Sequence, residues 1–194
     1  MKTEHTGMIE SVKDGIVTTV KGGGDIVQAT VNTVSNTLST TVNDAGKVGA
    51  SATAAIGDVA SGAIQGAAHV GAHLGHASKG IVIGVLQGTK HVGSAAMDTI
   101  GHTADAVIHQ TVAVGGKLEH ATTGLVEGAI HSAKGIGVSA EDAVSAVADG
   151  ALKAAGKVGS TAVETVRSAV TKTAHGANVM LKQPKVAEPV TSRH

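Results

Sequence analysis

Apolar residues recur along this chain at a step of eleven residues. From Val48 to Met180, every eleventh residue is apolar except Thr103, and a neighbouring column that starts at Ala52 is also apolar. Eleven residues in three turns correspond to about 3.67 residues per turn, close to the 3.6 of an α-helix. Each column therefore stays on one side of a helix. The pattern predicts a very long amphipathic helix.

The opposite side of the predicted helix is polar. A column that runs at the same step from Glu10 to His175 contains one apolar residue, Ala54. Two further columns, which begin at Val12 and Ile9 and are largely apolar, continue the same side beside the Ala52 column. On a helical wheel the apolar columns cover an arc of roughly 130°, which is typical of a helix with one covered face.

The predicted fold class is all-α, with the long amphipathic helix either extended or bent into hairpins or a loose bundle. We expect a frayed N-terminus over residues 1–7, a repeat region over residues 8–181 and a disordered polar tail over residues 182–194. Glycine-rich stretches inside the repeat region are candidate hinges. They lie near residues 22–24, 44–49, 115–116 and 135–137. Ser139, followed by Glu141 and Asp142, is predicted to cap a helix that starts after it.

The composition indicates a weak apolar face. The 194 residues include no Phe, Tyr, Trp or Cys, and 27 of them are glycine. Small apolar side chains bury little area, and each glycine inside a helix costs up to about 1 kcal/mol relative to alanine. We therefore expect the free helix to be marginally stable or disordered until something covers its apolar face.

Many of the glycines are spaced by four or five residues. They are Gly62, Gly66, Gly71, Gly75, Gly80, Gly84 and Gly88, with the same spacing at Gly124 and Gly128. Spacing of this kind lets helix backbones approach closely. The alternative is that glycine is a low-bulk filler of the apolar face.

The charge balance favours neutral partners. There are 15 basic and 15 acidic residues, so a basic face that would bind nucleic acid is not expected. The sequence contains no run of 18 or more apolar residues, which a conventional membrane-spanning helix requires. We expect a cytoplasmic protein that is peripheral on a lipid or granule surface.

Histidine is the most abundant potential metal ligand, with eleven copies. His69, His73 and His76 would share one side of a continuous helix and are the candidate site for zinc or copper. The alternative, which we favour, is that histidine is a neutral polar residue of the solvent face and that no metal or other cofactor binds. Below about pH 6 these side chains would gain charge.

Catalytic motifs are not recognisable. The sequence has no glycine-rich phosphate loop after a strand and no alternation of strands and helices. Its serines and threonines have no large apolar or aromatic residues that would wall a pocket. We expect a protein that is not an enzyme and has no small-molecule substrate.

Residues 124–135 and 150–159 resemble the eleven-residue repeats of perilipins and synucleins, which are rich in Gly, Val, Thr, Ala and Lys. This resemblance in pattern and composition extends over most of residues 8–181. It implies a chain that is disordered in solution and becomes helical on lipid. The chain also resembles late embryogenesis abundant proteins, which use similar repeats and fold on drying.

Three functions follow from these observations. The first is a surface-coating protein that binds lipid or a hydrophobic granule, since weak binding per repeat adds up over many repeats. The second is a stress or desiccation protectant, and the third is a structural helical protein that self-assembles, including as a homo-oligomer. The residues expected to face the lipid or a partner are Val48, Ala52, Ile56, Val59, Val70, Leu74, Ile81, Val85, Val92, Ile100, Val107, Val114, Leu118, Leu125, Ile136, Val144, Val147, Val158 and Val166.

Overall fold

The structure, a computed structural model, describes residues 2–21, 25–45, 50–89 and 94–177. These residues form eight α-helices and one short 3-10 helix, and none of them lies in a strand. The all-α class is therefore confirmed, but the predicted helix is divided into pieces of 16 to 20 residues. The helices are α1 (Lys2–Lys21), α2 (Ile26–Ala45), α3 (Ala50–His69), α4 (Leu74–Thr89), α5 (Ser94–Ala113), α6 (Leu118–Ala133), η1 (Lys134–Ile136), α7 (Ala140–Val158) and α8 (Ser160–Gly176).

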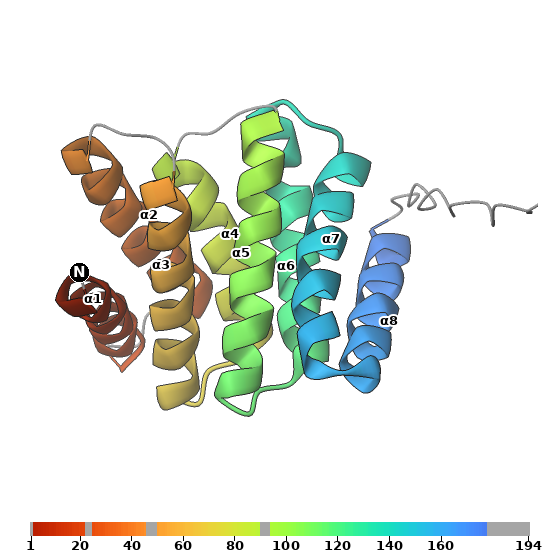
Figure 1. The fold of residues 1–194 in the computed structure, drawn as a ribbon, viewed down its shortest axis with the longest axis horizontal. Coiled ribbons are helices and arrows are strands. Elements are labelled where there is room, and N and C mark those ends of the chain that lie inside the picture. The colour runs from red at the N-terminus through yellow and green to blue at the C-terminus, as the bar shows by residue number, and fades with distance from the viewer. Residues whose placement is uncertain (1, 22–24, 46–49, 90–93, 178–194) are drawn as a thin grey trace, which may run out of the picture.

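The helices stand in two layers (Figure 1). Helices α1, α3, α5 and α7 contact one another in that order, and α2, α4, α6 and α8 form a second series in the same way. Helices α1 to α7 thus each pack most extensively on a helix two places away in the chain, whereas α8 packs equally on α6 and α7. Consecutive helices lie in different layers. This is the arrangement of stacked helical hairpins, in which each repeat contacts its neighbours.

Two of the predicted bend regions lie within the described residues. Residues 115–116 belong to the turn between α5 and α6, where Gly115 has a φ of 69°. Gly137 follows η1 with a φ of 72°. Glycine, which lacks a Cβ atom, adopts positive φ values of this kind with little steric penalty, so the chain can reverse at these points. Residues 22–24 and 46–49 lie outside the described residues, as does the predicted tail over residues 182–194.

Other boundaries differ from the expected ones. Helix α1 begins at Lys2, so residues 2–7, which were expected to fray, are helical in the structure. The chain also turns at residues 70–73, between α3 and α4, and again at Gly159, between α7 and α8. The eleven-residue pattern continues through both turns without an insertion. For that reason the periodicity alone did not indicate them.

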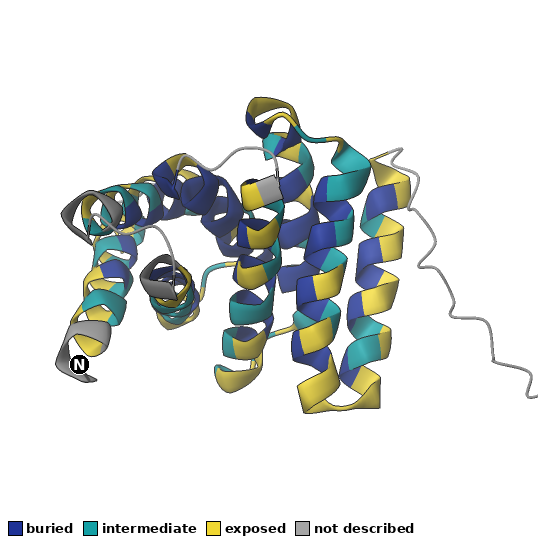
Figure 2. Ribbon diagram, turned by 45° about the horizontal axis from the view of Figure 1, so that its top comes forward, coloured by how far each residue is buried: buried dark blue, intermediate teal, exposed yellow. Residues whose placement is uncertain are grey.

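The apolar face of the pattern fills the space between the layers. The largest fully buried side chains are Ile16, Leu38, Ile64, Ile81, Ile100, Ile108, Leu125, Val12, Val34, Val59, Val82 and Val85. Every described member of the polar column from Glu10 to His175 is exposed or half-buried. Figure 2 shows the result, with buried residues turned toward the neighbouring helices and exposed residues turned outward. The columns therefore predict which side of each helix is covered.

Ser139 caps α7 as the sequence indicates. Its side chain accepts a hydrogen bond from the backbone N–H of Asp142 at 3.0 Å. Glu141 and Asp142 lie in the first turn, where negative charge is favourable beside the free N–H groups of the helix. The cap could be predicted from the sequence because its two partners, Ser139 and Asp142, are three residues apart in the chain.

Thr122 is a buried threonine whose hydroxyl has no hydrogen-bond partner. By contrast, the hydroxyl of Thr111, which is also buried, donates to the Val107 carbonyl oxygen at 2.7 Å. A buried polar group without a partner costs about 1–3 kcal/mol. We expect Thr122→Val to raise the free energy of unfolding by about 1 kcal/mol or more, measured by urea denaturation. Thr111→Val, which removes a satisfied hydroxyl, should give no such gain. Equal effects of the two substitutions would contradict this account.

Candidate functional site

The residues expected to face lipid or a partner lie mostly inside the protein. Eleven of them are buried: Ile56, Val59, Ile81, Val85, Ile100, Val107, Leu125, Ile136, Val144, Val147 and Val166. Four are half-buried: Val70, Leu74, Val114 and Leu118. Val158 is exposed, at 44%. Val48 and Val92 lie outside the described residues, as does the side chain of Ala52. The predicted face is thus one continuous internal surface that other helices of the same chain cover.

Glycines bring the helix backbones of each layer into direct contact. A Cβ atom added at Gly80 would lie 2.8 Å from the carbonyl oxygen of Val27, and one added at Gly84 would lie 2.9 Å from that of Val31. Real Cβ atoms essentially never approach so closely. These contacts join α4 to α2, and they leave no room for alanine unless the helices separate.

The tightest contacts lie further along the chain. A Cβ atom at Gly124 would overlap the carbonyl oxygen of Gly75, where α6 crosses α4, and one at Gly150 would overlap that of Gly101, where α7 crosses α5. The close-packing interpretation is therefore confirmed for every glycine of the series except Gly71, which lies in the turn before α4 and whose added Cβ would meet nothing within 4 Å. The partners in these contacts are helices of the same chain.

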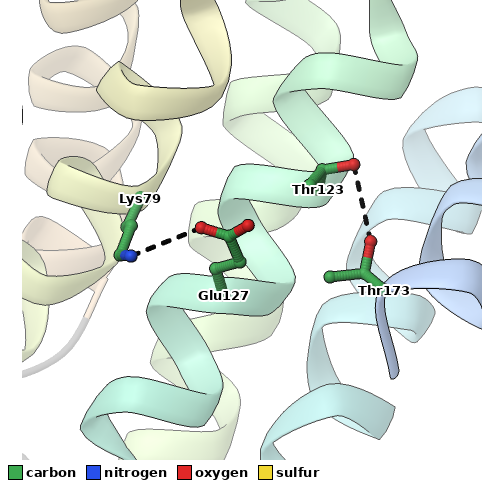
Figure 3. Close-up of polar contacts among 4 residues, drawn as sticks. All are labelled: Lys79, Thr123, Glu127 and Thr173. Atoms are coloured by element: carbon green, nitrogen blue, oxygen red, sulfur yellow. Dashed lines mark hydrogen bonds and ion pairs between the residues drawn. The ribbon is translucent and has the colours of Figure 1, made fainter. Parts of the chain in front are cut away.

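Polar side chains also make contacts between neighbouring helices. In Figure 3, the Lys79 Nζ of α4 lies 3.3 Å from a carboxylate oxygen of Glu127 in α6. The Thr173 hydroxyl of α8 lies 3.4 Å from the Thr123 hydroxyl of α6. Both contacts join helices of the same layer. Exposed ion pairs contribute about 1 kcal/mol or less, so the Lys79–Glu127 pair adds little to the stability of the packing.

A histidine cluster lies where α4 and α6 begin. The ring of His73 stacks on that of His120, with ring centroids 4.3 Å apart, and lies 5.1 Å from that of His76. Lys117 precedes α6 as its N-terminal cap residue. Desolvation of the ring, followed by the positive charges of His120, His76 and Lys117, lowers the pKa of His73 below 6.5.

The cluster corrects the histidine set proposed from the sequence. His69 ends α3, the chain then turns at Gly71 with a φ of 68°, and His76 belongs to α4. The spacing of His69, His73 and His76 therefore does not place them on one continuous helix. Within the part of the chain that the structure describes, no group of three His, Cys, Asp or Glu residues could hold a metal ion. The sequence did not indicate His120, because it joins the cluster from a different helix.

A groove of about 330 Å³ runs between α5 and α7, over the contact of Gly101 with Gly150. Its polar lining comprises Asp98, His102, Asp105, Ser145, Asp149 and Lys153. An ion pair at 3.4 Å joins Asp105 to Lys157 across these two helices. The groove is the space left where two helices meet through glycine, and its charges are spread along both rims.

None of the helices in the described ranges is long and apolar enough to cross a membrane.

Comparison with known proteins supports the fold. No protein family and no curated protein matches the chain. The crystal structure of the de novo designed helical repeat protein DHR7 is similar to it, with a TM-score of 0.54 and 16% sequence identity. The similarity covers 92% of this chain and 97% of the designed protein. At this identity the match shows the helical-repeat architecture alone.

Proposed function

We propose that this protein is a non-enzymatic structural module, a helical repeat that packs on itself. One observation carries the proposal: the apolar face that the sequence offers to a partner is covered by the chain's own helices. Among the described residues, Val112 and Val158 are the large hydrophobic side chains that are exposed. An isolated exposed side chain is normal for a protein surface and does not form an interaction patch.

The first and last helices of the described chain expose charged side chains. The last helix, α8, exposes polar residues such as Glu164, Arg167 and Lys172. The first helix, α1, exposes Glu10 and Asp14. Repeat proteins need terminal repeats with polar outer faces to stop further stacking.

Coating of a lipid or granule surface is the second candidate. The observation that favours it is that the buried face is continuous along the chain, so helices that separated at their turns would present it on one side. The face consists largely of Ala, Val and Gly, and burial of such small groups provides little hydrophobic stabilisation per residue. In this proposal the closed structure is a storage form, and lipid competes with the helices for the same face.

A reversible crosslink between α6 and α8 separates the two proposals. The chain has no cysteine, and the hydroxyls of Thr123 and Thr173 lie 3.4 Å apart. In the variant with Thr123→Cys and Thr173→Cys, a disulfide prevents these helices from separating. For a structural module, we expect cooperative helix in plain buffer by circular dichroism. We also expect no binding to phosphatidylcholine vesicles, phosphatidylglycerol vesicles or triacylglycerol emulsions, whether the disulfide is oxidised or reduced.

Three outcomes would contradict the structural proposal. Binding by the reduced protein that the disulfide suppresses would establish surface coating through an opened form. Helix that appears only on drying would support a desiccation protectant, and equal binding by both forms would place the lipid site away from the α6–α8 contact. The control variant carries Thr123→Ser and Thr173→Ser, which keeps the hydroxyls without offering a disulfide.

A further inference from the structure

The histidine cluster lies on the tightest backbone crossing between α4 and α6. Gly75 makes room for it, because a Cβ atom there would lie 3.0 Å from the ring of His73 and 2.8 Å from the carbonyl oxygen of His120. Gly75 is also the residue whose carbonyl oxygen leaves no space for a side chain at Gly124. The stacked rings of the exposed His73 and the half-buried His120 therefore lie directly at the point where the two helix backbones meet.

The charges around the cluster are mostly positive. His73 directly precedes α4 and His76 lies in its first turn, while Lys117 directly precedes α6 and His120 lies in its first turn. The beginning of a helix carries a partial positive charge from its free N–H groups. Protonated imidazoles here would face one another, a lysine and two helix N-termini.

The neighbouring acidic groups are already engaged. Glu119 of α6 lies 3.8 Å from the Nζ of Lys172 in α8, and Glu127 pairs with the Nζ of Lys79 in α4. Asp25, at the start of α2, accepts the backbone N–H of Gln28. His69, a further titratable base, is the last residue of α3, before the turn that leads into α4. The last turn of α5, up to Ala113, contains no charged residue.

We propose that the stack of His73 on His120, beside His76, forms an acid-sensitive latch that holds the α4–α6 crossing closed at neutral pH and releases it when the His73 ring is protonated. With neutral rings, His73 stacks on His120 and the backbones meet at Gly75 and Gly124. With a charged His73 ring, repulsion from Lys117 and from the two helix N-termini acts at that contact. The latch goes beyond the structural role proposed above, because it specifies where and under which condition the module opens.

The sign of the pH dependence follows from the direction of the pKa shift. The pKa of His73 is lowered in the folded protein by desolvation and by its positive neighbours. The unfolded chain therefore binds the proton more readily than the folded one. The stability contributed by the neutral ring is complete above about pH 6.5 and is lost as the pH falls from there through the lowered pKa.

Amide hydrogen exchange at pH 7.5 and pH 5.0, corrected for its intrinsic pH dependence, tests the latch. We expect opening of the first two turns of α4 and α6 to increase several-fold at pH 5.0, while α7 changes little. The variant with His73→Gln and His120→Gln should show the same opening at both pH values. The control variant with His109→Gln and His131→Gln, which alters exposed histidines of the polar column, should keep the wild-type response.

The latch is wrong if the His73 and His120 variant keeps the full acid response, or if opening at pH 5.0 is spread evenly over all helices. A ring titration of His73 at the unperturbed pKa, followed by nuclear magnetic resonance, would also overturn it. None of these results bears on vesicle binding, so failure of the latch is distinguishable from failure of the structural proposal.

Discussion

Gly150→Ala is expected to lower the free energy of unfolding by about 1–3 kcal/mol, although alanine is the better helix former. The added methyl group would overlap the Gly101 carbonyl oxygen and lie 2.8 Å from the Gly101 carbonyl carbon. Both are backbone atoms of α5, so no side-chain rotation relieves the contact and α5 must move away from α7. Separation of two helices along their contact loses dispersion contacts on both surfaces. Urea denaturation followed by circular dichroism measures the effect.

Two other glycines provide matched controls for Gly150→Ala. Gly156 lies in the same helix, and a Cβ atom there would meet nothing within 4 Å. Gly101 lies on the other side of the same crossing, where its added Cβ would make an ordinary 3.5 Å contact with the Ala146 carbonyl oxygen. We expect Gly156→Ala to stabilise the protein by about 0.4–1 kcal/mol and Gly101→Ala to be neutral or mildly stabilising. If Gly150→Ala also stabilises, α5 and α7 do not meet through backbone contact.

The part of the fold that the sequence predicts is the side of each helix that is covered. Leu125, Val147 and Val166 were placed on one face by spacing alone, and all three are buried in the structure. What covers them was not predictable in this way. An apolar arc of small side chains is suited both to a lipid surface and to another helix, and periodicity describes a single helix without its neighbour.

The covering is decided by where the chain turns. A straight continuation from α3 into α4 would leave the apolar face exposed along its whole length, whereas the turn at Gly71 folds α4 back so that α3 and α4 lie in different layers. A single glycine among the 27 in the sequence is a weak signal for such a turn. The glycines spaced by four or five residues were a stronger signal of helix packing. Glycine at these positions lets the backbone of a second helix come close, which a Cβ atom would prevent.

The candidate site shows the same limit. The sequence grouped His73 with His69 and His76 because they are neighbours along the chain. The stacked partner of His73 is His120, which belongs to the next helix of the same layer. Helical spacing predicts which residues lie close together within one helix. The pairing of α4 with α6 depends instead on the turns between them. Local features such as the Ser139 cap were predictable because their partners lie within four residues.

Leu125→Ala is expected to lower the free energy of unfolding by about 2–5 kcal/mol. Leu125 is 0% exposed in α6, and truncation leaves a cavity between the layers as well as losing the burial of the removed carbon atoms. Val158 belongs to the same eleven-residue column but is 44% exposed, at the end of α7. Val158→Ala is therefore expected to change the free energy of unfolding by less than about 0.5 kcal/mol.

The contrast between these two substitutions tests whether the column is a core or a docking face. In the packed structure their effects on unfolding differ severalfold, since Leu125 is fully buried in the core while Val158 meets solvent. If the column instead lay on lipid in the working state, both truncations would weaken vesicle binding to a degree set by the lost apolar area, and neither would affect unfolding in buffer strongly. Urea denaturation without lipid and vesicle cosedimentation, performed on both variants, distinguish the two states, because the packed state predicts a large effect in the first assay and the lipid-bound state predicts an effect in the second. A large loss of stability for Leu125→Ala, with no change in vesicle binding for either variant, would show that the eleven-residue pattern encodes the interior of a helical repeat.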